Sequence, residues 1–160
     1  MTTGELITRA SIWLAMLCWT AAIISRGKPS AKWYWAAGFD IYCLHILFAY
    51  GVFYEWSNET AWDQTAQQTA EVTGLETGVG LIVNFTFAAI LLFDVIQQWR
   101  GRKTFRNLVD AFVIFMIVNG AIVFGHGPVR VYGAALILAL VLVARKHLAR
   151  SRSTTTRGSS

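Results

Sequence analysis

Charged residues are scarce in this sequence. Asp, Glu, Lys and Arg make up only 14% of the 160 residues, whereas hydrophobic residues make up 55%. An average soluble domain carries about 25% charged residues. The charges also gather in a few short segments between long apolar runs, so the chain lacks the polar surface that covers a water-soluble domain. We therefore expect a lipid bilayer around the apolar runs.

Cysteine and the common catalytic motifs are equally scarce. The two cysteines, Cys18 and Cys43, fall inside apolar runs, which argues against a disulfide framework and a thiolate metal site. There is no Gly-rich phosphate loop, no Cys-x-x-Cys and no His-x-x-x-His pair, and no serine or cysteine has a nearby base. Nucleophilic, metal-assisted and phosphoryl-transfer chemistry lack their minimal parts, so the sequence favours a protein without enzymatic activity and without a metal.

Five apolar runs are long enough, or nearly so, to cross a hydrocarbon core of about 30 Å at about 1.5 Å per residue. They cover residues 7–25, 33–54, 79–98, 108–124 and 131–144. Gly125, Gly127 and Pro128 interrupt the pattern between the last two runs, which favours a tight helical hairpin there. The sequence thus predicts an all-α fold, a polytopic membrane bundle of about five transmembrane helices in a single domain over residues 1–150.

Loop charges predict the orientation of this bundle. All but two of the 14 basic residues lie in the loops and tail that five crossings place on one side, the exceptions being Arg9 and Arg130. Because Lys and Arg favour the cytoplasmic side, we expect the N-terminus outside and the C-terminus inside a cell (inner) membrane. The same rule accounts for the net charge of +5, so no nucleic acid is expected as a partner. The Ser-, Thr- and Arg-rich residues 151–160 are predicted to be disordered.

One long polar connection, residues 57–77, is predicted to lie outside as an amphipathic segment. Asn58 is expected to cap a short helix, and Gly74 to end it in the left-handed conformation. Trp62, Ala66 and Ala70 recur every four residues and form a stripe that we expect to face the membrane. A lid over an outward-facing pocket is the alternative for this segment.

Polar residues inside the apolar runs are the candidate functional residues, because an ionisable group in hydrocarbon is costly. Asp40 and Asp94 are predicted about 10 Å deep from the cytoplasmic helix ends, with Asp110 shallower. One interpretation is a ring of ion pairs with the neighbouring basic residues, and the other is a cytoplasm-facing cation or proton site. Asp94 shares a helix face with the glutamines that follow it, which indicates a polar stripe.

His45 lies near the middle of the second run, with Tyr42 one turn below it on the same face. An interhelical hydrogen bond is one interpretation, and proton relay or ligand contact is the other. His45 is the only candidate ligand for a haem or pigment, and Met16 or Met116 would have to supply the second axial bond. Asn84, between Gly80 and Ala88, is predicted to make a buried amide hydrogen bond that allows two helices to pack closely.

Three hypotheses of function remain open. The first is a non-enzymatic subunit, scaffold or accessory protein of a membrane complex, with a protein partner or a second copy in the membrane and no cofactor. The second is a small ion- or proton-coupled transporter that uses Asp40, Asp94 and His45. The third is a haem- or pigment-binding redox subunit, which rests on His45 alone.

Overall fold

The computed structural model describes residues 2–102, 106–120, 131, 133–135 and 137–138, which form helices and connecting turns without a strand among them. The chain divides into two compact parts, Met1–Met116 and Ile117–Ser160. Much of the predicted span at 131–144 lies outside the described residues. The predicted hairpin turn at 125–128 and the predicted tail at 151–160 lie entirely outside them.

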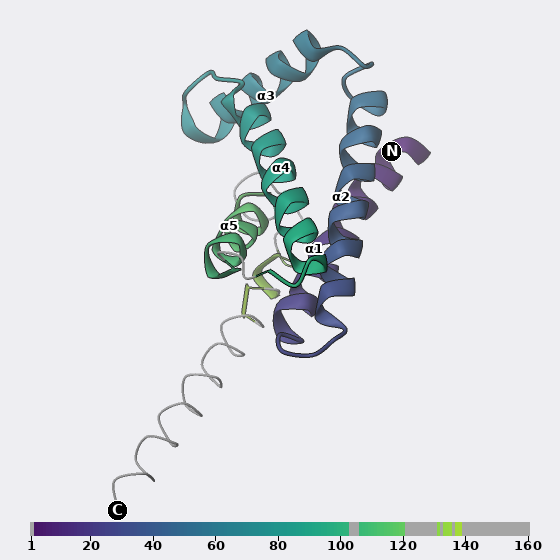
Figure 1. The fold of residues 1–160 in the computed structure, drawn as a ribbon. Coiled ribbons are helices and arrows are strands. Elements are labelled where there is room, and N and C mark those ends of the chain that lie inside the picture. The colour runs from purple at the N-terminus through teal and green to yellow at the C-terminus, as the bar shows by residue number, and fades with distance from the viewer. Residues whose placement is uncertain (1, 103–105, 121–130, 132, 136, 139–160) are drawn as a thin grey trace, which may run out of the picture. The chain divides into compact units, whose positions relative to one another are not determined.

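Three helices are long and apolar enough to span a membrane: α1 (Thr3–Ile24), α2 (Ala31–Val52) and α4 (Val79–Trp99). They coincide with the first three predicted spans, which confirms a helical protein with several apolar helices of spanning length. Helix α5 (Arg106–Val118) is apolar but shorter. Helices α1 and α2 form an antiparallel pair, and α4 runs beside α2 (Figure 1).

Helix α1 begins four residues before the predicted span because a capping box fixes its first turn. The Thr2 hydroxyl accepts a hydrogen bond from the Glu5 amide at 3.3 Å, and the Glu5 carboxylate accepts one from the Thr2 amide at 3.0 Å. Both bonds satisfy amides that lack a partner within the helix. The polar residues before Ile7 therefore belong to the helix, although they were predicted to precede it.

The polar connection contains the predicted short helix, α3 (Asn58–Thr73). Ser57 caps it by accepting a hydrogen bond from the Thr60 amide at 3.2 Å, so the prediction that Asn58 is the cap was wrong. Asn58 is instead the first residue of the helix, one position too late for its side chain to act as the cap. The prediction for Gly74 is confirmed, because it ends the helix with φ of +77°.

Helix α3 is anchored to the ends of α2 and α4, which it connects (Figure 1). The Gln64 amide donates a hydrogen bond to the Phe53 carbonyl at 3.0 Å, and the Trp62 ring lies directly against Gly78. Ala61 and Ala66 are buried, whereas Trp62 remains 41% exposed. Of the predicted stripe, Ala66 thus packs within the protein, Ala70 is half-buried, and part of the Trp62 ring faces outward.

An aromatic cluster joins the three long helices. Trp19 of α1, Tyr42 of α2 and Phe87 of α4 lie with ring centroids 5.3–5.6 Å apart, and all three side chains are buried. Gly38 of α2 admits the Trp19 ring, since a Cβ at Gly38 would lie only 2.5 Å from Trp19 Nε1. Tilted and edge-to-face ring pairs at these distances are favourable. This cluster fixes which face of α2 points inward.

Candidate functional site

A hydrogen bond from His45 joins α2 to α1. The Nδ1 atom of His45 lies 2.9 Å from the Thr8 carbonyl oxygen and 3.3 Å from the Ser11 hydroxyl. A carbonyl oxygen only accepts, so Nδ1 must carry the proton, and Nε2 has the lone pair in the neutral ring. The contact is an interhelical hydrogen bond, one of the two arrangements considered from the sequence. The sequence analysis did not identify Thr8 and Ser11 as partners of His45, although they lie one turn apart at the start of the first apolar run.

Tyr42 lies beside His45, and its hydroxyl forms a hydrogen bond that joins α2 to α4. Its hydroxyl donates to the Asn84 carbonyl oxygen at 3.3 Å, and its ring stacks with the His45 ring at 6.2 Å between centroids. Asn84 is exposed, so the prediction of a buried amide hydrogen bond was wrong, and this residue contributes through its backbone carbonyl. Three of the five predicted site residues, Tyr42, His45 and Asn84, therefore lie near one another, and their contacts link α1, α2 and α4.

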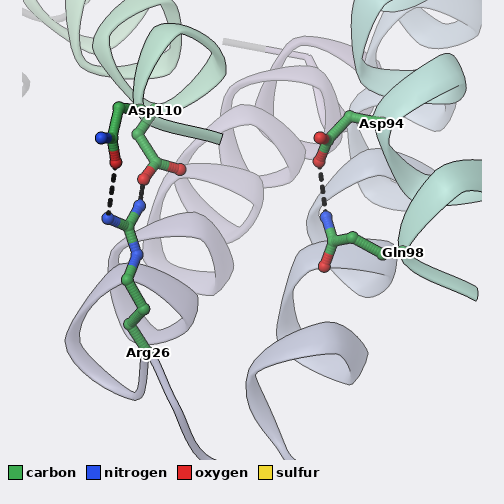
Figure 2. A network of polar contacts seen from close by, with 5 residues as sticks. Arg26, Asp94, Gln98 and Asp110 are labelled. Carbon is green, nitrogen blue, oxygen red and sulfur yellow. Dashed lines mark hydrogen bonds and ion pairs between the residues drawn. The ribbon is translucent and has the colours of Figure 1, made fainter. Parts of the chain in front are cut away.

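A salt bridge joins Arg26, in the turn after α1, to Asp110 of α5 (Figure 2). The Arg26 guanidinium also donates to the Asn107 amide oxygen at 3.5 Å. The Asp110 side chain is only 8% exposed, against 43% for Arg26. Partial burial lowers the pKa of the Arg26 guanidinium, but arginine stays charged at any physiological pH. This pair matches the predicted ion pairing of the acidic residues, with a basic partner that the sequence did not single out.

Asp94 is buried in the last two turns of α4 with an exposed fraction of 1%. Its carboxylate accepts a hydrogen bond of 2.5 Å from the Gln98 amide, one turn further along the same helix (Figure 2). This hydrogen bond joins two residues of the predicted polar stripe. Figure 2 shows this contact and the Arg26–Asp110 pair as two separate interactions.

Asp40 is exposed on α2. Gly38 and Tyr42, two positions before and after it, face the aromatic cluster, and successive helical residues are about 100° apart. Asp40 therefore points away from the core. The predicted pairing of Asp40 with Asp94 in one site remains a prediction, but the two side chains occupy different environments, one exposed and one buried.

A cation–aromatic cluster at the start of α2 and the end of α4 was not predicted. Trp33 and Trp99 meet edge to face at 4.7 Å between centroids, and the Lys32 ammonium lies 4.9 Å from the Trp99 ring and 5.9 Å from the Trp33 ring. Tryptophans at the ends of apolar helices are typical of the headgroup level of a membrane. Only the packing of α2 beside α4 brings them together around Lys32.

The arrangement gives no support to the haem hypothesis. No group of three or more His, Cys, Asp or Glu side chains suited to a metal occurs in the part of the chain that the structure describes. Met16 lies about 7 Å further along α1 than Ser11, at about 1.5 Å per residue, whereas His45 lies level with Thr8 and Ser11. Met116 is half-buried in α5, and His126 and His147 are outside the described residues.

Comparisons with protein families, curated proteins and solved structures found no match to this chain.

Proposed function

We propose that this protein is a non-enzymatic, membrane-embedded subunit or accessory protein that acts through lateral contacts with other membrane proteins. The single observation that carries the proposal is Asp40, which is exposed on a helix of spanning length. A charged side chain near the centre of a membrane-spanning helix costs about 2.5–3.5 kcal/mol by insertion scales, so it is retained where something covers it.

The other polar groups support the same function because they hold the helices to one another. His45 bonds α2 to α1, Tyr42 bonds α2 to α4, and Arg26 pairs with Asp110 of α5. Interhelical polar contacts of this kind stabilise membrane bundles and need no ligand. The bundle also presents apolar side chains outward on α1, α2 and α4, which is suitable for contact with lipid or with partner helices.

The proposed topology has five crossings, with the N-terminus outside, the basic loops in the cytoplasm and the protein in the inner membrane of a bacterium. The charge asymmetry of the sequence supports it. Reporters that are active on only one side of the membrane test it. A fusion after Arg150 is expected to be active in the cytoplasm and a fusion at Gly74 outside. Activity of both fusions on the same side contradicts this topology.

Purification from native membranes in a mild detergent tests the subunit function. The tagged full-length chain is expected to elute with other membrane proteins at fixed stoichiometry, well above the 17.8 kDa of one copy together with its detergent. A chain that runs alone, and whose deletion leaves every membrane complex intact, contradicts the proposal. The matched control is an unrelated helical membrane protein with the same tag.

A small ion- or proton-coupled transporter is a second candidate, favoured by the burial of the Asp94 carboxylate within α4. A buried carboxylate in a membrane helix is a common element of proton and cation pathways. A flux assay in vesicles tests it with Asp94→Asn, and Asp63→Asn on α3 is the control. Transport is expected to be lost only in Asp94→Asn. Equal transport by both variants removes the reason for this candidate.

A further inference from the structure

Asp40 is held outward by the packing of α2 on both sides of it. A Cβ at Gly38 would lie 2.5 Å from the Trp19 ring, and Tyr42 is 4% exposed between Trp19 and Phe87. Rotating α2 to bring Asp40 inward would separate these contacts and also break the bond from His45 to Thr8. The outward position of this carboxylate is therefore a consequence of the fold.

The depth of Asp40 prevents it from reaching water along the helix surface. It lies about 13 Å from the first residue of α2, Ala31, at about 1.5 Å per residue. Aspartate has a single methylene group, so it cannot extend to the interface as lysine and arginine do. Lipid alone offers this carboxylate neither a hydrogen-bond donor nor a counter-charge.

Two basic residues before and at the start of α2 have other partners. Arg26 forms the salt bridge to Asp110, and the Lys32 ammonium lies against the Trp99 ring. Among the described residues, Arg26–Asp110 is the salt bridge that the structure contains, and Asp40 takes part in none. The part of the chain that the structure describes therefore gives Asp40 no ion-pair partner.

The face around Asp40 is apolar and exposed over several turns. Leu44 and Leu47 lie four and seven positions after Asp40, on the same side of α2, and they are 48% and 52% exposed. Trp33, seven positions before Asp40, contacts Trp99 of α4 but is still 60% exposed. A helix that lies along this face would pack against the leucines and bring its own side chains level with Asp40.

We infer that this face of α2 docks a transmembrane helix of a partner protein that carries a lysine or arginine at the depth of Asp40. The inference rests on the proposed subunit function and specifies the partner's chemistry. An ion pair satisfies both charges in hydrocarbon, whereas either charge alone is costly.

A second copy of the chain suits this face less well than a basic partner helix. Two copies would bring two carboxylates together, which repel each other. The basic residue within α1, Arg9, follows Thr8 and so lies level with His45, about 7 Å along α2 from Asp40 at about 1.5 Å per residue. Copies inserted in the same orientation would therefore not place Arg9 opposite Asp40.

A defined probe tests the inference before any partner is identified. The full chain, with a fluorophore on a terminal tag, is reconstituted in phosphatidylcholine vesicles together with a labelled polyleucine helix. This helix has lysine, leucine or glutamate at one central position, and association is measured by energy transfer. We expect the lysine helix to bind about tenfold more tightly than the leucine helix, as for other interhelical polar contacts. The glutamate helix is expected to bind more weakly than either.

Variants then assign the preference to Asp40. Asp40→Asn is expected to abolish the preference for lysine, Asp40→Glu to keep it, and Asp40→Lys to transfer it to the glutamate helix. Asp63→Asn, an exposed acidic residue on α3, is the control and should behave as wild type. A general effect of folding does not produce the reversal of preference in Asp40→Lys, so that variant separates ion pairing from structural damage.

Three results would overturn the inference. The first is equal binding of the lysine and leucine helices to wild type, which would mean that Asp40 is already covered within the chain. The second is a lysine preference that survives Asp40→Asn. The third is Asp40-dependent association of the chain with itself in place of the lysine helix. If the native chain elutes in a complex but shows no lysine preference, the subunit function stands and this docking face is wrong. A lysine preference in a chain that runs alone in native membranes leaves the docking chemistry supported and contradicts the subunit function.

Discussion

Replacing Gly38 by alanine tests the close approach of α1 and α2. The added Cβ would lie 2.5 Å from Nε1 and 2.6 Å from Cδ1 of Trp19, and that ring is only 1% exposed. The ring has no free space to move into, so the helices must separate or the tryptophan must adopt a strained rotamer. Overpacking of this kind costs about 1–3 kcal/mol.

Gly51 provides the matched control within the same helix. A Cβ there would lie 3.1 Å from the Trp56 ring, which is 66% exposed and free to shift outward. Both substitutions gain helix propensity, about 0.8–1 kcal/mol in a helix interior and less near the end of α2. Both variants share this gain, but only Gly38→Ala forces an overlap with a buried ring. We therefore expect Gly38→Ala to be less stable than Gly51→Ala by about 1–3 kcal/mol.

The assay is reversible unfolding in mixed micelles, followed by helical circular dichroism with increasing denaturing detergent. A second substitution, Trp19→Phe, removes part of the overlapping ring and is expected to reduce the penalty of Gly38→Ala. Equal stability of Gly38→Ala and Gly51→Ala would refute the close approach of Trp19 to Gly38. It would also remove the main reason for placing Asp40 on the outer face.

Three further predictions follow from the polar contacts. In the unfolding assay, His45→Leu is expected to lose about 1 kcal/mol of stability, because the bond to the Thr8 carbonyl is lost, and His45→Gln should lose less. A double-mutant cycle between Arg26 and Asp110 is expected to give a coupling of about 0.5–1 kcal/mol, kept low by the exposure of Arg26 to solvent; zero coupling would contradict the salt bridge. Trp99→Leu is expected to cost about 0.5–1 kcal/mol by removing the cation–π contact with Lys32, and the same loss in Lys32→Met would confirm that the two side chains act together.

The sequence predicts the helices of this protein better than their contacts. Apolar length alone located α1, α2 and α4, and glycine chemistry correctly ended α3 at Gly74. The start of α1 was placed late because its capping box consists of polar residues outside the apolar run. The Ser57 cap was missed because serine and asparagine are about equally good caps, so adjacent candidates cannot be separated by residue type.

The site was harder to predict because a helix that is apolar on nearly every side gives no signal of its rotation about its own axis. Depth in the membrane follows from counting residues, and on that basis Asp40 and Asp94 are predicted at the same depth. Direction depends on which residues permit close packing, and in α2 that residue is Gly38, next to a tryptophan of α1. Once Gly38 is placed against Trp19, the geometry of the helix puts Tyr42 inward and Asp40 outward. Gly38 is therefore the sequence feature that distinguishes the inward Tyr42 from the exposed Asp40. Its role could be recognised only once the position of Trp19 on α1 was known.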